Sequence, residues 1–381
     1  MSKYINLIFL IFFLALSDSI LAQKDSLNSK FNVHGDFRFR AEQDWNSRKS
    51  DGTYRQDRTR LRYRVRLGVT YDYNEAISIG FRIRTGNPIK QQDPQLTLGG
   101  TEGEFGTLPI GIERAYLKGE ISNFEFWIGK NTFPFKKQNE LFWSDHVYPE
   151  GVSLSKEIMF DGHSLNSIKL VAGHFIIRHG GSSLGVDNYF QGFQSDVKFL
   201  NNRMELFPSI YLFRNTPNVP DGGETYVFDY SIFHIGYRIV ISKHPLISLE
   251  ADFYKNLEDY SKNDSIHYGF KNQNAGINIG FAFGKLVDRG DWLFKFTYNY
   301  QQQYSLVDFM AQNDWARWDY SSQGSPDGRL SNYKGFELVS GYSLGKNFTL
   351  RMKYYHVNQL VPYGNYTETG SRIRFDVDIG F

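Results

Sequence analysis

The chain has 381 residues, with 43 Lys and Arg balancing 41 Asp and Glu to a formal net charge of +2, and it contains no cysteine. The charge balance argues against a nucleic-acid-binding protein, and the lack of cysteine excludes disulfides, thiolate chemistry and an acylated cysteine anchor. Aromatic residues reach 17%, yet the mean hydropathy is −0.45, a combination that excludes a helical membrane protein.

Residues 1–22 predict a cleaved secretory signal peptide. Lys3 precedes an apolar run over residues 7–16, and the small Ala22 lies where cleavage is expected. The run is shorter than the roughly 20 residues that a membrane-spanning helix needs. We therefore expect export to the periplasm and a mature chain of residues 23–381, still with a net charge of +2 because Lys3 and Asp18 are removed together.

Residues 31–42, 58–71 and 76–86 alternate apolar and charged side chains with a period of two, which predicts β-strands. The second segment is the clearest, because Leu61, Val65 and Leu67 share one face while five arginines share the other. Looser versions of the pattern continue to residue 381. We count about sixteen strands, an even number as bacterial outer-membrane barrels require, and residues 165–171 and 174–180 are counted as two of them.

The connections between these strands alternate in length. Short turns near residues 74, 201, 244 and 346 alternate with long segments at 44–55, 87–109, 132–163, 216–226, 257–267, 305–330 and 359–370. Short periplasmic turns and long outer loops are the rule for transmembrane barrels. With the N-terminus in the periplasm, every long segment falls on the outer side.

The fold class predicted is an all-β, transmembrane, antiparallel up-and-down barrel of about 16 strands, within a range of 14–18, formed by residues 23–381 as one domain. A secreted β-sandwich or propeller also has alternating strands, but it buries one face, and a face of five arginines is not buried without partners. In a barrel that face looks into a wet lumen while the apolar face meets lipid and lipopolysaccharide. The last strand, 372–381, fits this as a sealing strand, and its aromatic end, Phe381, resembles the terminal signal read by the barrel-assembly machinery.

The arginine segment "DRTRLRYRVRLG" and the segment "GIERAYLKGEISNFEFWIGKNTFPFKKQNELFWSDHVYPEGVSLS" resemble the porin family of Bacteroidetes-type outer membranes. A weaker likeness is to phosphate-selective and carboxylate-selective porins, which use barrels of this size with basic lumen residues. The resemblance implies passive diffusion of small hydrophilic solutes across the outer membrane, without enzymatic activity, metal or cofactor. Diffusion porins of this size are often homotrimers, although the sequence singles out no interface.

The basic residues favour anionic solutes. Because neighbours pair in an up-and-down barrel, the last strand lies beside the first, and twelve arginines share one lumen-facing sector. Their fields overlap within a Debye length of about 8 Å at physiological salt, which enriches anions. Structural pairing with Asp36, Glu42, Asp376 and Asp378 is an equally good reading of any single arginine. The predicted pore-lining residues are Arg38, Arg40, Arg58, Arg60, Arg62, Arg64, Arg66, Arg82, Arg84, Arg114, Arg372 and Arg374.

The long segment 132–163 is the candidate constriction loop, since one loop of a diffusion porin commonly folds into the lumen. Its aromatic residues and prolines indicate an ordered segment, and the alternative is an outward loop packed on the rim. If the loop folds inward, five charged residues face the arginines: Lys136, Lys137, Glu140, Asp145 and Glu150.

The second functional hypothesis is a barrel-scaffold enzyme, lipase-like, or an adhesin without an open pore. "RHGGSSLG" resembles the oxyanion loop of esterases, but no G-x-S-x-G motif accompanies it, so a surface turn is the better interpretation. An outer-wall phospholipase would need a serine and a histidine, for which Ser164 with His163 or His174 are the candidates. The nine histidines show no metal-ligand spacing.

Overall fold

The computed structural model describes residues 30–381 apart from 93, 101–104, 163, 182–183, 218–226, 265, 267, 316–330 and 363. The predicted signal peptide, residues 1–22, lies outside the described residues, as does His163. In the part of the chain that the structure describes, no helix is long and apolar enough to cross a membrane.

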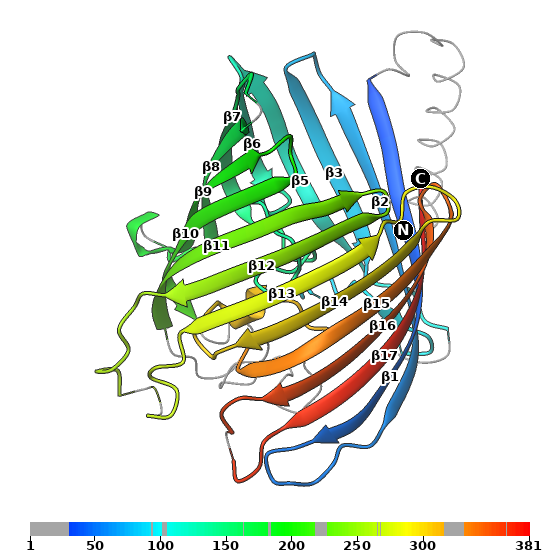
Figure 1. The fold of residues 1–381 in the computed structure, drawn as a ribbon, viewed down its shortest axis with the longest axis vertical. Helices are drawn as coiled ribbons and strands as arrows, with labels where there is room; N and C mark the ends of the chain where they lie inside the picture. The colour runs from blue at the N-terminus through cyan, green and yellow to red at the C-terminus, as the bar shows by residue number, and fades with distance from the viewer. Residues whose placement is uncertain are drawn as a thin grey trace, which may run out of the picture.

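Alternating side chains build long antiparallel strands that curve into a barrel (Figure 1). Within the described residues, sixteen long strands make up the wall, and a two-residue strand, β4, pairs with the outer part of β2. The strands are β1 (Phe31–Arg48), β2 (Arg58–Asp72), β3 (Ile77–Thr85), β4 (Leu96–Thr97), β5 (Ile110–Ile121), β6 (Phe124–Lys130), β7 (Glu150–Met159), β8 (Leu165–Arg178), β9 (Asn188–Phe199), β10 (Met204–Pro217), β11 (Val227–Lys243), β12 (Leu246–Asn256), β13 (Ala275–Gly284), β14 (Trp292–Gln301), β15 (Tyr333–Gly345), β16 (Phe348–Gln359) and β17 (Thr369–Gly380).

The first and last strands close the barrel. β1 pairs with β17 from the Asp36–Gly380 position to the Arg48–Thr369 position, and Gly35 exchanges two backbone hydrogen bonds with Phe381, at 2.9 and 3.0 Å. Closure leaves no long strand edge unpaired, which a lipid-exposed sheet requires. The predicted fold class and the predicted sealing role of the last strand are confirmed.

The strand count of sixteen is confirmed, although two of the predicted segments are wrong. Residues 150–159, assigned to the loop 132–163, form strand β7, so the loop ends at residue 149. Residues 165–171 and 174–180, counted as two strands, belong to the single strand β8. The interruption at Gly173 is local, because the ring of Phe175 covers this glycine where a Cβ would lie. The prediction therefore missed β7 and divided β8 into two strands, and these two errors offset each other in the count.

The two faces of the wall differ as the alternation predicts. On β2, Leu61, Val65 and Leu67 are 42–44% exposed on the outside, whereas Arg64 between them is 2% exposed. On β14, the aromatic side chains of Trp292 and Phe294 are likewise exposed to the outside. An apolar outer face with polar side chains turned inward is the arrangement of a transmembrane barrel.

Connection lengths alternate around the barrel. Long loops follow β1, β3, β6, β8, β10, β12, β14 and β16, and shorter turns follow the strands between them. The turn after β2 is held by Asn74, whose side-chain oxygen accepts the backbone N–H groups of Ala76 (3.0 Å) and Ile77 (2.8 Å). The first residues of β1 and the C-terminus lie at the end with the short turns, so the predicted alternation is confirmed (Figure 1).

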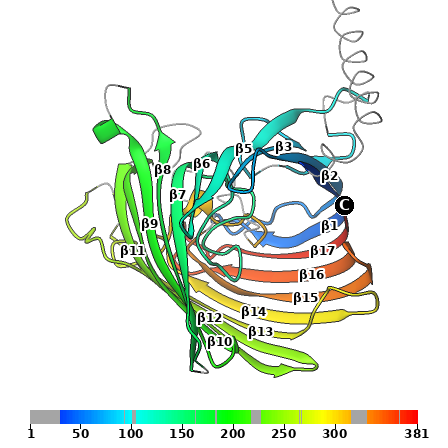
Figure 2. The same ribbon diagram turned by 90° about the horizontal axis from the view of Figure 1, so that it is seen from above.

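Viewed from above, segments of several loops lie inside the ring of strands (Figure 2). They come from the connections after β3, β6 and β14. The last of these contains a one-turn 3-10 helix, η2 (Asp308–Met310), whose three residues are all buried. The contacts of these segments with the wall define the interior described next.

Candidate functional site: a divided lumen

Arginine side chains from β1, β2, β3, β5 and β17 gather on the inner face of one sector of the wall. The strand register places Arg38 opposite Arg64 and Arg40 opposite Arg62, while β17 lies along the other edge of β1. We call this the arginine sector. It contains Arg38, Arg40, Arg58, Arg60, Arg62, Arg64, Arg66, Arg82, Arg84, Arg114, Arg372 and Arg374, the full set singled out from the sequence.

Carboxylates alternate with these arginines across neighbouring strands. Asp36 accepts hydrogen bonds from Arg64 (2.6 Å) and Arg66 (2.7 Å). Two further pairs span β1 and β17, with Arg38 Nε 2.5 Å from Asp378 and Arg40 Nε 2.6 Å from Asp376.

Glu42 is almost fully buried and forms ion pairs with Arg60 and, at 3.6 Å, with Arg62. The four acids named from the sequence, Asp36, Glu42, Asp376 and Asp378, therefore all pair with arginines of the sector. Pairing of this kind holds the long side chains in fixed positions.

Three further carboxylates in the sector were not predicted. Asp44 was assigned to a loop, but β1 extends to Arg48, and Asp44 pairs with Arg58 (2.8 Å) and Arg372 (2.5 Å). Asp314 comes from the loop after β14 and forms an ion pair with Arg374. The third is Glu113 on β5.

Glu113 enters the lumen through a β-bulge. Arg82 lies opposite Arg114 and Ile83 opposite Ile112, which leaves Glu113 as the extra residue on β5. A bulge lets two successive side chains point to the same face. Glu113 is 2% exposed and lies 2.6 Å from Arg82 Nε, so strict parity missed it.

Two arginines also anchor the loop between β3 and β5. Arg84 donates hydrogen bonds to the carbonyls of Thr85 (2.9 Å) and Lys90 (2.7 Å), and Arg62 donates to the carbonyl of Gln95 (2.9 Å). Because guanidinium groups carry several donors, one arginine can pair with an acid and fix a loop at once. These two arginines therefore have a structural role in addition to their charge.

A surplus of positive charge remains after this pairing. Among the described residues of the sector, twelve arginines stand against seven carboxylates, leaving five formal positive charges. The acids are Asp36, Glu42, Asp44, Glu113, Asp314, Asp376 and Asp378. Neighbouring strands are about 4.8 Å apart, so these charges act on the same volume of water.

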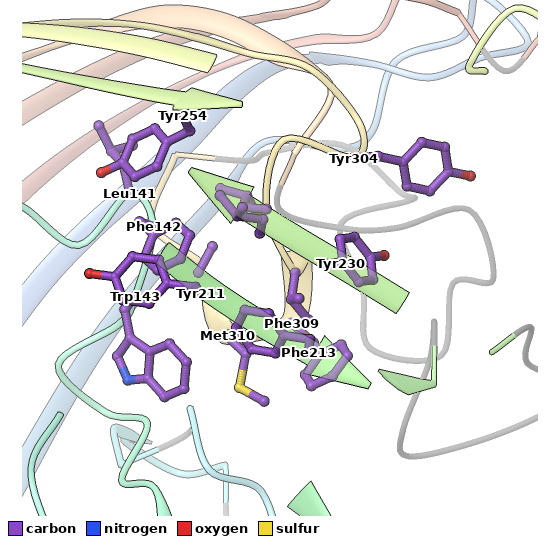
Figure 3. Packing of buried hydrophobic residues seen from close by; sticks show 14 of the residues in the cluster. Leu141, Phe142, Trp143, Tyr211, Phe213, Tyr230, Tyr254, Tyr304, Phe309 and Met310 are labelled. Carbon is purple, nitrogen blue, oxygen red and sulfur yellow. The ribbon is translucent and has the colours of Figure 1, made fainter. Parts of the chain in front are cut away.

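The opposite side of the lumen is filled by apolar and aromatic side chains (Figure 3). Inward residues of β8 to β12 pack against the loops after β6, β12 and β14 in one cluster. Phe190, Ile232 and Leu306 are completely buried in it, and Trp143 and Phe213 are 1% exposed. We call this the aromatic cluster.

The loop of residues 131–149, between β6 and β7, lies inside the barrel on this cluster. The ring of Phe142 stacks on Tyr254 of β12 with centroids 5.0 Å apart and an interplanar angle of 3°. Phe135 packs edge-on against Tyr211 of β10 at 5.4 Å. Gly192 on β9 makes room for Phe135, because a Cβ there would lie 2.3 Å from the ring.

Polar contacts fix the same loop to the wall. Gln194 of β9 accepts the backbone N–H of Lys136 (2.6 Å) and donates to its carbonyl (3.0 Å). Asn139 donates to Asp252 (2.9 Å) and Asn278 (3.0 Å). An inward loop held by both apolar packing and hydrogen bonds is an ordered element.

Three loops meet in the middle of the lumen. Ser144 of the β6–β7 loop donates its N–H to the carbonyl of Met310 (2.8 Å), and Gln312 donates its N–H to the carbonyl of Glu140 (3.0 Å). From the β3–β5 loop, Gln92 donates to the carbonyls of Phe309 (2.8 Å) and Ala311 (2.6 Å). Together the loops form a bridge inside the lumen, and its residues Trp143, Phe309 and Met310 belong to the aromatic cluster.

The charged residues predicted for the constriction loop do not all reach the arginines. Glu140, Asp145 and Glu150 line the same cavity as the arginine sector. Lys137 pairs with Asp145. Lys136 faces away, since its ammonium lies 3.2 Å from Glu205 on β10, so its predicted position opposite the arginines is wrong.

Glu140 and His146 of this loop have shifted pKa values. Burial raises the pKa of Glu140 above its usual range, with further contributions from the negative charges of Asp145 and Asp314. Burial and the nearby charge of Arg64 hold the pKa of His146 well below its usual range, so His146 is neutral near pH 7.

A cavity of about 910 Å3 lies between the loop bridge and the arginine sector. It is lined by Arg38, Arg40, Arg60, Arg62, Arg372 and Arg374 of the twelve arginines, together with Lys353 and Asp314. A second cavity, of about 420 Å3, shares Glu140, Asp314 and Lys353 with the first and extends along β14 to β16. Both of these cavities are therefore lined in part by cationic side chains.

Ser164 and His174, two of the enzyme candidates that lie within the described residues, are not brought together. Ser164 and His174 lie ten residues apart, His174 within β8, roughly 30 Å at 3.3 Å per residue. In "RHGGSSLG", Asp187 accepts the N–H of Gly180 (2.6 Å) and contacts His179 (3.0 Å), which makes a loop turn. Over the residues that the structure covers, no three His, Asp or Glu side chains gather as a metal site.

The closed antiparallel wall, the apolar outer face and the charged inner face are the features of a transmembrane β-barrel. Residues 52–204 match the family model described as "Putative porin", which confirms the resemblance to porins for that part of the chain. No curated protein matches the chain.

Solved porin structures share the fold over nearly the whole chain. Pseudomonas putida OprB superposes with a TM-score of 0.56 at 12% identity, covering 93% of this chain and 95% of that one. The outer membrane channel DcaP of Acinetobacter baumannii gives 0.54 at 14% identity (92% and 97%), and Salmonella typhi OmpF gives 0.53 at 11% identity (92% and 97%). The family match and the fold together support an outer-membrane channel.

Proposed function

We propose that this protein is an outer-membrane channel for passive diffusion of small hydrophilic solutes, and that it prefers anions. The observation that carries the preference is the surplus of five positive charges in the arginine sector, next to a cavity of about 910 Å3. Positive walls around a narrow aqueous space concentrate anions and exclude cations.

Arginine is suited to this role. Its charge is permanent at any relevant pH, and its planar group pairs with carboxylates and phosphates in a fixed geometry. In the sector most arginines already share an acid, which weakens the hold of any one of them on a passing anion. A row of weak contacts allows a solute to enter and to leave, as conduction requires.

The orientation follows from the connections. We place the short turns and the C-terminus in the periplasm and the long loops outside, because periplasmic turns of such barrels are short. The solute then enters past the long loops and crosses the barrel beside the loop bridge, along the arginine sector.

The test is conductance of the purified protein in planar lipid bilayers under a KCl gradient. We expect stable, ohmic steps and a reversal potential on the anion-selective side. The triple variant Arg60→Gln, Arg62→Gln, Arg64→Gln should reduce the chloride-to-potassium permeability ratio by about twofold or more, since it removes three of the twelve arginines.

The matched control is the triple variant Lys169→Gln, Lys198→Gln, Arg238→Gln, which removes the same charge from inward positions on β8, β9 and β11. Heat-dependent migration on gels checks that each variant forms a folded barrel. An unchanged reversal potential in the first variant, or an equal shift in the control, would contradict the proposed role of the arginine sector.

A further inference from the structure

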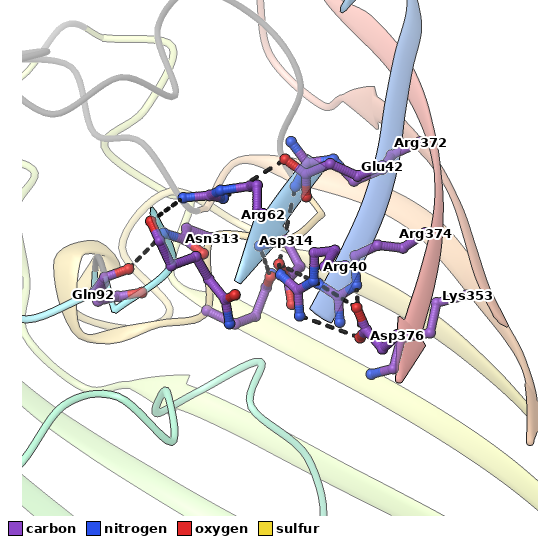
Figure 4. Close-up of polar contacts among 12 residues, drawn as sticks. Arg40, Glu42, Arg62, Gln92, Asn313, Asp314, Lys353, Arg372, Arg374 and Asp376 are labelled. Atoms are coloured by element: carbon purple, nitrogen blue, oxygen red, sulfur yellow. Dashed lines mark hydrogen bonds and ion pairs between the residues drawn. The ribbon is translucent and has the colours of Figure 1, made fainter. Parts of the chain in front are cut away.

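One carboxylate in the arginine sector does not belong to the wall. Asp314 lies in the loop after β14, yet its side chain reaches across the cavity to β1 and β17 (Figure 4). It forms an ion pair with Arg374, and its Oδ1 lies 3.9 Å from both Arg40 and Arg372. A loop residue thus places a carboxylate among three guanidinium groups.

The turn that presents Asp314 is held by buried side chains. The side-chain oxygen of Gln312 accepts the N–H groups of Asp314 (2.5 Å) and Trp315 (3.0 Å), while its amide donates to the hydroxyl of Tyr333 (2.9 Å). Trp315 is 3% exposed and packs against Tyr333 and Tyr355. The position of Asp314 is therefore set by its neighbours and does not depend on its own charge alone.

The three arginines differ in how closely they contact carboxylates of the wall strands. Arg40 makes two hydrogen bonds to Asp376, at 2.6 and 3.2 Å, and Arg372 makes two to Asp44, at 2.5 and 3.1 Å. Arg374 makes a longer contact with its wall carboxylate, because its Nε lies 3.3 Å from Asp376. Arg374 therefore relies most on Asp314.

We propose that Arg40, Arg372 and Arg374 form a binding site for a solute carboxylate, which Asp314 fills when no solute is bound. This inference rests on the proposed function and adds to it a ligand class and a competing group. The occupant present in the structure is a carboxylate, which matches the planar guanidinium groups. Asp314 keeps 23% of its side chain exposed toward the cavity, so an incoming carboxylate can replace it there.

A tethered competitor sets the strength of such a site. A tethered group competes at an effective concentration that its tether sets, so a solute must reach a comparable concentration to displace it. The site is then weak and exchangeable in the wild-type chain. Removing the Asp314 charge should make it bind tighter.

The experiment uses block of chloride current by succinate in planar bilayers, with the full-length mature protein. We expect Asp314→Asn to lower the half-blocking concentration of succinate about tenfold, the size of a typical coupling between two sites. Adding Arg374→Gln to Asp314→Asn should abolish that gain, since it removes the arginine that Asp314 contacts most closely.

The control is Asp259→Asn, which removes the same charge from an exposed position in the loop after β12. Asp259 accepts a hydrogen bond from the backbone N–H of Ser261 (2.9 Å), and asparagine can keep that contact. In this variant, succinate should block the chloride current at the same half-blocking concentration as in the wild type. Gel migration with and without heating confirms that each variant folds.

The outcomes separate the two proposals. Absence of conducting steps or of anion preference in the wild type would overturn the proposed function. If the wild type conducts with anion preference, but Asp314→Asn has the same half-blocking concentration of succinate, the proposed site would be overturned. The proposed channel function would then still stand. Inorganic phosphate is the second probe, and an equal gain for phosphate and succinate would overturn the assignment to carboxylates.

Discussion

The arginine sector and the aromatic cluster occupy opposite sides of one lumen and differ in almost every physical respect. In the sector, charged groups meet in pairs and stay within reach of the cavity water. In the cluster, rings pack at centroid distances such as 4.5 Å between Phe190 and Phe213, and their side chains are buried. The same alternating strands supply both sides.

This difference indicates that the two sides of the lumen have different roles. Apolar packing is strong and without charge, so the cluster is suited to holding the loops in place. Ion pairs near water contribute little stability each, but they keep charge where a solute passes. The cluster therefore positions the loop bridge, and in the proposed channel the bridge confines the solute to the arginine sector.

The largest effect on conductance should come from disrupting the aromatic cluster. Trp143→Ala removes a side chain that is 1% exposed at the base of the loop, and loss of such a residue costs about 3–5 kcal/mol of packing. We expect the loop to leave the cluster, with larger and noisier conductance steps. The readout is single-channel conductance, and heat-dependent gel migration should show that the barrel itself persists.

A glycine gives an independent test of the same idea. Gly192→Val places side-chain atoms where the Phe135 ring now lies, so it should also release the loop. Gly345→Val is the matched control, because nothing lies within 4 Å of a Cβ at that position. Unchanged conductance in both Trp143→Ala and Gly192→Val would show that the cluster does not hold the constriction.

The next effect concerns pH, through Glu140 at the border of the two sides. Because its pKa is raised, Glu140 is still protonated over a range above the ordinary glutamate value of 4.5 and becomes charged as pH rises through its own pKa. The added negative charge lies beside the cavity. We therefore expect anion preference to fall as pH rises through that range.

Glu140→Gln should remove this pH dependence and keep the preference of the acidic form. Reversal potentials measured at several pH values test it. His146 does not contribute near pH 7, because its pKa is lowered and it stays neutral. Should the variant retain the full pH dependence of the wild type, another group must be responsible.

The strongest periodic patterns predicted the wall well. On β2 the arginines and the apolar residues alternate without a break, so the strand and its inward face follow from the sequence. β7 was missed because a charged residue, Lys156, occupies the face that carries Val152, Leu154 and Ile158. Its ammonium lies 4.5 Å from the ring centroid of Phe124, a contact that no local pattern reveals.

The interior contacts were much harder to predict, because they join residues distant in the chain. Nothing near Asp314 in the sequence indicates that it meets Arg374, and the pairing depends on the path of a whole loop. Glu113 enters the lumen through a bulge, and the ordinary strand period assigns it to the other face. Lys136 was placed on the wrong side because a loop has no fixed period.

The smallest effect should come from a change that keeps an apolar side chain in the aromatic cluster. Phe142→Leu leaves a smaller apolar side chain at a site that is 4% exposed, so it should cost less than the roughly 3–5 kcal/mol expected of a Phe-to-Ala change. The ring also stacks on Tyr254 at 5.0 Å, and such pairs contribute about 0.5–1.5 kcal/mol beyond the area that they bury. If filling space is what holds the loop, Phe142→Leu should leave conductance unchanged and lower only slightly the temperature at which the folded gel band disappears. A conductance rise as large as that of Trp143→Ala would instead show that ring stacking on β12 fixes the loop.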